Sequence, residues 1–250
     1  MKQFFAVGLG IFLLVSHSRG ALYLGNGDTS FSGAVGLGSL SLTDNGTVIS
    51  GTFTRGTGSF LDSLVIFIDS KSGGFSTTSG FTDASTRQAR NISGLDGTGN
   101  RATATFATGF SADYAIVLAN HNSNHGGELY QVVNNGTHID IGSVNLSPID
   151  SGTASSYTFS LNWSDIGLTG APGVSFKFES TYIGDTGFRS LESFETLTGD
   201  PGWGDVTFGN FHTYVAPVPE TTNVALAVFG AAALGMGLLR RARRFRSKGG

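Results

Sequence analysis

Residues Ser39–Arg55 read Ser-Leu-Ser-Leu-Thr-Asp-Asn-Gly-Thr-Val-Ile-Ser-Gly-Thr-Phe-Thr-Arg, and the rest of the expected fold repeats their pattern. Polar and apolar residues alternate in Ser39–Thr43 and again in Thr47–Arg55, as they do in strands that bury one face. Between these strands, Asp44-Asn45-Gly46 is a turn sequence that readily adopts positive φ. The stretch therefore predicts an antiparallel β-hairpin.

Further strands are expected on both sides of this hairpin. Leu64–Ile68 and Tyr114–Ala119 are apolar throughout, which is typical of strands covered on both faces. A second hairpin is predicted from Glu128–Val133 and Thr137–Val144, joined by Asn134-Asn135-Gly136. Other strands are expected at Ala102–Phe110, Tyr157–Leu161, Val174–Glu179 and, as the last strand before the tail, Val206–Phe208.

Helical signals are short and few. Asp83–Asn91 predicts one short helix capped by Asp83, and Trp163–Leu168 predicts a single turn with Trp163 in the core. No strand pair is separated by a sustained helical period, so parallel βαβ units are not expected. The sequence predicts an all-β fold, an antiparallel two-sheet sandwich of jelly-roll type over residues 21–215. Such a body loosely resembles the sandwich modules of extracellular sugar-binding proteins.

Both ends of the chain carry export signals. Residues 1–20 combine Lys2, an apolar core at Phe4–Val15 and small residues before Ala21, which predicts a cleaved signal peptide. Residues 216–250 contain Pro219-Glu220, the apolar run Val224–Leu239 and a basic end. That run has 16 residues, about 24 Å as a helix, and with its flanking residues predicts a transmembrane helix over 222–239. The basic residues predict a cytoplasmic end after it.

This tail resembles the PEP-CTERM sorting signal of Gram-negative bacteria. The matching residues are the short motif, the single small helix and the arginines, namely Val218, Pro219, Glu220, Arg240, Arg241, Arg243 and Arg244. The second Pro of the family motif is replaced by Thr221, and Val-Pro-Glu-Thr also looks like a distorted sortase signal. The resemblance implies processing by an exosortase-type membrane protease, then release to the cell surface or an exopolysaccharide matrix. A plain C-terminal membrane anchor is the alternative.

Charge and cysteine content limit the classes of partner. Of 15 Lys and Arg, two precede residue 21 and six follow residue 239, which leaves seven against 18 Asp and Glu, a net charge of −11. An acidic body repels phosphate backbones, so nucleic acid is not an expected partner, whereas calcium is a candidate ligand. Because the chain has no cysteine, its stability must come from the core or from bound ions.

Two histidine patterns are candidates for chemistry. His121 and His125 have the spacing of a helical metal pair, but the residue after His121 is Asn122 where a zincin has Glu, so a solvated loop is the favoured interpretation. His138 and Asp140 are predicted to share one strand face, and such a pair could serve a nucleophile. The segment Gly109–Asp113 begins like a nucleophile elbow and lacks its closing glycine. The sequence does not predict catalysis from these residues.

The late loops carry the most interesting polar residues. Five acidic residues fall within 21 positions, namely Asp185, Glu192, Glu195, Asp200 and Asp205. Two of them could form a glycosidase pair, others could hold calcium, and a solubilising acidic rim is the simplest alternative. In Pro201-Gly202-Trp203-Gly204-Asp205, the glycines let Trp203 leave the loop and stack on a sugar, with Asp200 and Asp205 accepting hydroxyl hydrogen bonds.

The function expected from these features is that of an exported, surface-sorted, non-enzymatic protein of the cell envelope or exopolysaccharide matrix that binds glycan. The alternative is a polysaccharide-acting hydrolase that uses the late-loop carboxylates. The two differ in whether two carboxylates converge in a cleft at about 5–10 Å.

Overall fold

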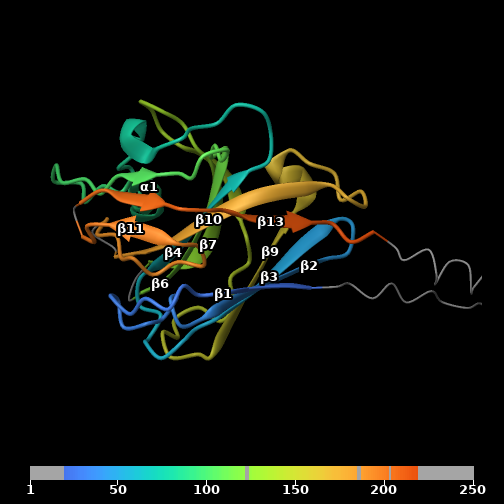
Figure 1. The fold of residues 1–250 in the computed structure, drawn as a ribbon, viewed down its shortest axis with the longest axis horizontal. Helices are drawn as coiled ribbons and strands as arrows, with labels where there is room; N and C mark the ends of the chain where they lie inside the picture. Colours follow the sequence, from blue (N-terminus) through green and yellow to red (C-terminus); the bar gives the residue numbers. More distant parts are fainter. Residues whose placement is uncertain (1–19, 122–123, 185–186, 203, 219–250) are drawn as a thin grey trace, which may run out of the picture. The chain divides into compact units, whose positions relative to one another are not determined.

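The computed structural model describes residues 20–218 apart from 122–123, 185–186 and 203, and side chains are not described at 121–125. Residues 19–217 form one compact unit. Within it, the strands are arranged in three sheets (Figure 1). The predicted signal peptide up to residue 19, the predicted helix 222–239 and the basic end lie outside the described residues.

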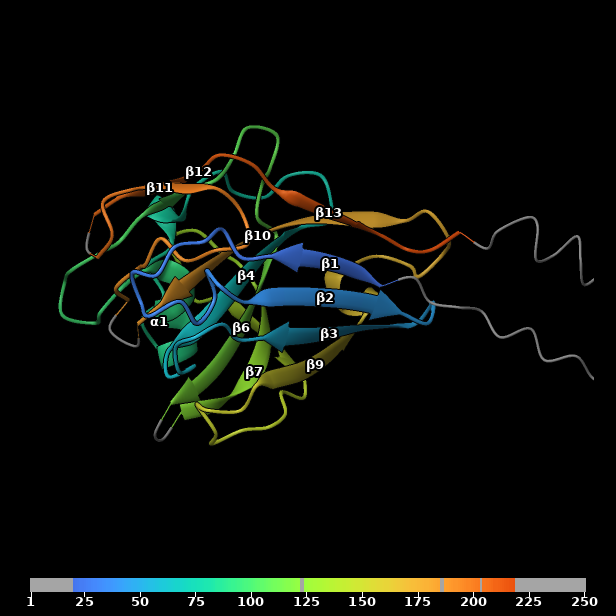
Figure 2. The same ribbon diagram turned by 60° about the horizontal axis from the view of Figure 1, so that its bottom comes forward.

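The first sheet is antiparallel and contains the hairpin predicted for Ser39–Arg55 (Figure 2). Asp44 accepts a hydrogen bond from the Gly46 N–H at 2.8 Å, and Gly46 has φ +84°, so the turn forms as its residues predict. The strand order is β1-β2-β3-β9, with β1 Ala21–Leu24, β2 Ser39–Asp44, β3 Val48–Thr54 and β9 Ser156–Asn162.

The second sheet is also antiparallel and has the order β13-β10-β4-β6-β7-β8. Its strands are β4 Ser63–Asp69, β6 Tyr114–His121, β7 Asn124–Gln131, β8 Ile139–Ser143, β10 Ser175–Ile183 and β13 His212–Val215. Strands β7 and β8 together form the second predicted hairpin, and Asn135 in its turn has φ +52°. The strand β13 corrects the prediction that Val206–Phe208 is the last strand.

The two larger sheets pack face to face around a first core, which confirms the all-β, antiparallel architecture. Alternate residues of each sheet point into it, as the period of two requires. Trp163 is buried here, at the start of the 3₁₀ turn Trp163–Ile166, as the sequence predicts. The jelly-roll likeness remains a prediction.

A third layer covers the other face of the second sheet; the sequence predicts its strand Val206–Phe208 and a short helix, but not the layer itself. It contains a small sheet in the order β11-β12-β5, the helix α1 and a 3₁₀ turn, with β5 Ala104–Thr105, β11 Leu197–Gly199, β12 Val206–Phe208, α1 Arg87–Ser93 and the turn Thr78–Gly80. Together they enclose a second core. This layer explains why β4 and β6 are apolar on both faces, as predicted.

Two local predictions in this layer are wrong. The strand expected at Ala102–Phe110 is only two residues long, because its last part turns back into a loop, where the Phe110 N–H donates to Ala107 O at 3.0 Å. The helix begins later than expected and its cap is Thr86, whose hydroxyl accepts from the Ala89 N–H at 3.1 Å. Asp83 instead accepts from the Ser85 and His138 N–H groups.

Candidate functional site

The turn between β11 and β12 brings Asp200 and Asp205 together at an exposed tip, which we call the aspartate tip. The Asp200 N–H donates to the Asp205 carbonyl at 3.1 Å, so the two residues face each other across the turn. In both ribbon views, the end of the body with β11 lies opposite the end where β13 finishes (Figures 1 and 2). Trp203, the third member of the predicted glycan contact, lies outside the described residues.

Arg189 braces the aspartate tip. Its backbone forms two hydrogen bonds with Gly202. The Arg189 N–H donates to the Gly202 carbonyl at 3.2 Å, and the Gly202 N–H donates to the Arg189 carbonyl at 2.7 Å. Its fully buried guanidinium donates to Ala102 O at 2.9 Å through Nε and to Ile92 O at 3.1 Å through Nη2. The tip is thereby tied to the end of α1 and to the start of the third layer.

Burial lowers the pKa of Arg189 to about 9, because the protein interior disfavours the charged form, and the charge of Arg101 adds to this effect. The side chain thus remains protonated at neutral pH. Its guanidinium carbon lies 5.9 Å from the Phe67 ring centroid. Sequence reasoning missed this residue, since a single Arg in a loop between acidic residues carries no distinguishing pattern.

Glu192 is not part of an acidic rim. Its carboxylate is fully buried and accepts four backbone hydrogen bonds from one loop. The donors and their distances are Phe31 N–H at 2.7 Å and Gly33 N–H at 2.7 Å to Oε1, and Val35 N–H at 2.8 Å and Gly36 N–H at 3.2 Å to Oε2. All of these bonds hold the loop 31–36, so Glu192 has a structural role.

Glu195 is also buried, and it fastens its segment to the part of β10 that extends beyond the pairing with β13. Its Oε2 accepts from the Ser180 N–H at 2.9 Å and from the Ser180 and Ser193 hydroxyls at 2.7 Å each. Burial raises its pKa to about 7, although these hydrogen bonds oppose the shift. Among the described late-loop carboxylates, only Asp200 and Asp205 are exposed, while Asp185 lies outside the described residues.

Glu179 is a buried carboxyl group on the polar side of the alternating stretch Val174–Glu179. The alternation of Val174–Glu179 is real, but the third layer covers the face that Lys177 and Glu179 share. Burial raises the Glu179 pKa to about 9, and the charges of Glu195 and Asp69 add to this effect. The signal that was overlooked is Ile183, an apolar residue on the same face four positions later.

His138 has a different partner from the one predicted. It is buried and precedes β8, while Asp140 is exposed, so the two do not form a pair. Its Nε2 lies 3.1 Å from Ser93 Oγ, and its Nδ1 accepts from the Val133 N–H at 3.0 Å. Because Nδ1 is an acceptor, the ring proton lies on Nε2 and is donated to Ser93. This is the reverse of the arrangement in which histidine activates a serine.

The remaining sequence candidates have structural roles or are not described. Gly109–Asp113 is a turn in which Asp113 accepts from the Ser70 and Lys71 N–H groups at 3.0 Å each. His121 ends β6 and His125 lies in β7, so they belong to paired strands and not to the expected loop; their side chains are not described. In the described part of the chain, no three His, Cys, Asp or Glu residues are grouped so that they could hold a metal ion. Calcium binding therefore remains a prediction with no located ligands.

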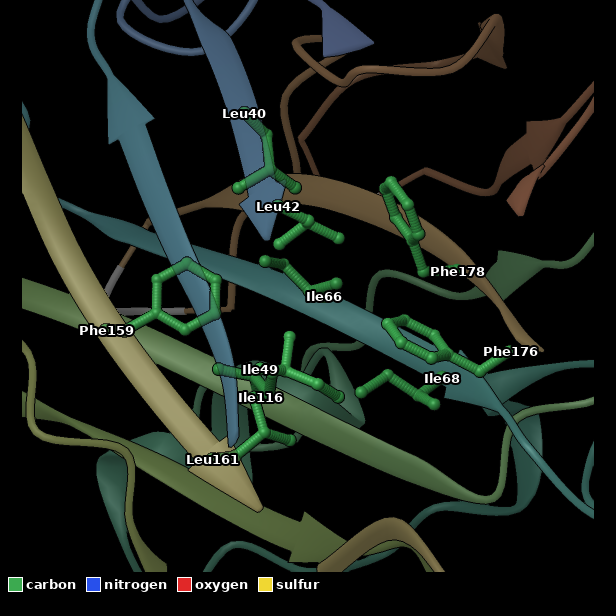
Figure 3. Close-up of a pocket in the computed structure, with 10 residues that line it drawn as sticks. All are labelled: Leu40, Leu42, Ile49, Ile66, Ile68, Ile116, Phe159, Leu161, Phe176 and Phe178. Carbon is green, nitrogen blue, oxygen red and sulfur yellow. The ribbon is translucent and has the colours of Figure 1, made fainter. Parts of the chain in front are cut away.

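A small cavity lies between the two larger sheets. Figure 3 shows its lining, which consists entirely of apolar side chains from both sheets, including Leu42, Ile66 and Phe178. Its volume is about 10 Å³, near the smallest space that holds one water molecule. We interpret it as a packing void and not as a ligand site.

Of the predicted sorting signal, the structure describes Val218 alone, and that side chain is exposed. Pro219, Glu220 and the four arginines, Arg240, Arg241, Arg243 and Arg244, lie outside the described residues. In the part of the chain that is described, no helix is long and apolar enough to cross a membrane.

Comparison of the chain with protein-family models, with curated proteins and with solved structures finds no match.

Proposed function

We propose that this chain is an exported, surface-sorted protein of the cell envelope or exopolysaccharide matrix, and that it binds glycan without catalysing a reaction on it. The observation that carries the proposal is the aspartate tip, two exposed carboxylates at a turn that the buried Arg189 holds in place. Carboxylates accept hydrogen bonds from sugar hydroxyls, and a braced turn loses little conformational entropy on binding.

The position of the tip supports this proposal. Residue 218 follows β13 at the end of the body opposite to the tip (Figure 2). If the tail acts as the resemblance implies, an exosortase-type protease meets the chain at the membrane near Pro219-Glu220. The tip is exposed at the end of the body opposite to the one where β13 finishes, so it is accessible to a polysaccharide. The protein is transiently anchored in the inner membrane and afterwards reaches the cell surface or the extracellular matrix.

The buried late-loop carboxylates do not support the alternative of a polysaccharide-acting hydrolase, because Glu192 is 0% exposed and Glu195 is 1% exposed, so a polysaccharide does not reach them. Glu192 uses both oxygens to bind backbone N–H groups, and Glu195 uses one oxygen to fasten β10. A glycosidase needs one carboxyl group that can donate a proton to the substrate and a second that can reach it. The proposal therefore assigns binding, and not hydrolysis, to the exposed pair.

The test is binding of the full-length protein to a panel of neutral and acidic polysaccharides, with product release measured in parallel. The variant Asp200→Asn with Asp205→Asn should bind at least about tenfold more weakly, since a hydrogen bond to a charged group contributes roughly 1.5–3 kcal/mol. Trp203→Ala tests the predicted stacking. The matched control is Asp140→Asn, an exposed aspartate on β8. Equal binding by all variants would contradict the tip assignment, and release of oligosaccharides would contradict a non-enzymatic role.

A further inference from the structure

Lys177 and Asp69 are in contact where β10 and β4 lie side by side, and Glu179 lies two residues further along β10. Lys177 and Asp69 are direct partners in the register of these antiparallel strands, and Lys177 Nζ lies 3.1 Å from Asp69 Oδ2. Glu179 follows two residues later on β10 and so projects from the same face of the sheet as Lys177. All three belong to the face that the third layer covers.

One loop contacts all three side chains. The Ala107 N–H donates to Glu179 Oε1 at 3.0 Å, Lys177 Nζ donates to the Gly109 carbonyl at 2.6 Å, and the Ser111 N–H donates to Asp69 Oδ2 at 3.3 Å. Loop 107–111 thus holds the Lys177 amine and the carboxyl groups of Asp69 and Glu179 in fixed positions relative to one another.

Aromatic side chains lie beside Lys177, and Glu179 is fully buried next to the same cluster. The Phe211 ring centroid lies 5.0 Å from Lys177 Nζ, and Phe106 and Phe110 belong to the same buried cluster. Glu179 is 0% exposed, and its Oε2 has no hydrogen-bond partner among the described residues. With its pKa raised to about 9 by burial, Glu179 carries a proton at neutral pH and can donate it.

We propose that Lys177 and Asp69 form an intramolecular amide bond, between Lys177 Nζ and Asp69 Cγ, with Glu179 as the group that transfers protons. This inference is independent of the proposed function. It follows from the 3.1 Å contact between the amine and the carboxylate, and from the buried, unpartnered carboxyl oxygen of Glu179.

The reaction is a condensation. Glu179 donates its proton to the Asp69 carboxylate, and Lys177 gives up a proton so that its neutral amine can attack Cγ. The C–N bond forms and one C–O bond of Asp69 breaks. The departing oxygen leaves as water, and its two protons balance the two that the Lys177 ammonium group lost. Glu179 recovers its proton, so ammonium plus carboxylate gives amide plus one water and no oxidant or metal is needed. Water can leave because the Lys177 side chain is 37% exposed.

Such a bond would join two strands of the central sheet in a chain that has no cysteine. An ion pair between partly exposed groups stabilises a fold by only about 0–1 kcal/mol. A covalent link between residues 108 positions apart instead restricts the unfolded chain, as a disulfide across a long loop does.

The test is mass spectrometry of the purified full-length protein after denaturation and digestion with trypsin. The amide predicts one linked species that contains Asp69 and Lys177, whose mass is lower by one water than the sum of its two peptides, and no cleavage after Lys177. Two separate peptides with ordinary cleavage after Lys177 would overturn the proposal and leave an ion pair only.

Variants assign the roles of the three groups. Lys177→Arg and Asp69→Ala should abolish the linked species, and persistence of that species in either would overturn the assignment. The matched control, Lys71→Arg, should still be linked, because Lys71 Nζ donates to Tyr114 OH and not to Asp69. Glu179→Gln should slow the reaction roughly 10²-fold, the usual lower contribution of acid–base catalysis. Linking of this variant at the wild-type rate would remove Glu179 from the mechanism.

Discussion

Glu192 accepts a hydrogen bond from the backbone N–H of Gly33 at 2.7 Å, although 159 positions separate the two residues. This bond and its three neighbours connect the first glycine-rich loop of the body to the segment that precedes the aspartate tip. A buried carboxylate with four N–H donors is well satisfied, and any change that removes its charge leaves the donors short of acceptors.

The first prediction concerns this carboxylate. Glu192→Gln should lower the free energy of unfolding by roughly 2–4 kcal/mol, because an amide group turns one donor toward the N–H groups and weakens the remaining bonds. Chemical denaturation of wild type and variant measures the difference. Asp140→Asn, at an exposed site, serves as the control and should change stability by less than about 0.5 kcal/mol. A similarly small effect of Glu192→Gln would show that the loop does not depend on the charge.

The second prediction concerns pH. The folded-state pKa of Glu195 is raised to about 7 from 4.5, so between these values the folded state binds more protons than the unfolded state. Stability contributed by this group is therefore complete below pH 4.5 and is lost as the pH rises toward 7. Glu195→Gln should remove this loss, and its stability relative to wild type should increase with pH by up to about 1.4 kcal/mol per unit in that window.

Denaturation of both proteins at several pH values measures this difference. The comparison with wild type is needed because His138 acts in the opposite direction. Burial lowers the His138 pKa to about 4, so its contribution to stability is lost as the pH falls below its ordinary value of 6.5. A constant difference between wild type and Glu195→Gln over the window would rule out a raised Glu195 pKa.

The third prediction concerns Ser93 and His138. With the ring proton on Nε2, His138 cannot accept the Ser93 proton, so a serine-directed fluorophosphonate should leave Ser93 unmodified. Ser93→Ala should instead cost roughly 1–3 kcal/mol of stability, because it leaves the buried Nε2–H without an acceptor. Labelling of Ser93 in the folded protein would contradict the assigned tautomer.

The fourth prediction concerns sorting. In a host with the exosortase-type protease, wild type should give a shortened, released form, while Pro219→Ala with Glu220→Ala should remain full-length and membrane-retained. In a host without that protease, both proteins should stay membrane-bound and equal in length. Immunoblots of membrane and released fractions distinguish the outcomes. If the double variant is trimmed like wild type, the tail is better described as a plain anchor.

The fifth prediction concerns calcium. The residues between the signal peptide and the basic end carry a net charge of −11, which calcium could relieve by binding. Calcium should then raise the melting temperature more than sodium chloride of equal ionic strength does. Equal shifts would indicate screening alone and no specific site.

Sequence patterns predicted most of the two larger sheets because local residues specify them. The turn at Asp44-Asn45-Gly46 is stabilised by its own side chains. The runs Leu64–Ile68 and Tyr114–Ala119 are apolar at every position, which indicates that both of their faces are buried. The sequence predicted the strand Val206–Phe208 but not the third layer to which it belongs, because the strands of this layer have only two or three residues and show no period from which their packing could be inferred. Short segments of this kind are fixed by what they pack against.

The candidate sites were harder to predict for a related reason. Asp200 and Asp205 could be placed together because only four residues separate them. The roles of Arg189, Glu192 and Glu179 depend on partners from 72 to 161 positions away, and no spacing in the sequence reveals those contacts. For Glu179, burial was decided by the third layer, which the sequence did not show.

The direct chain connection between the aspartate tip and residue 218 has a mechanical consequence. From Asp205 the chain passes through β12 and then β13, which pairs with β10 along His212–Val215. A pull between a ligand on the tip and an anchored tail would run along these two strands. The load would act parallel to β13, so its hydrogen bonds to β10 would be sheared together instead of being opened one at a time. The other strands of the sandwich would lie beside the path of the force.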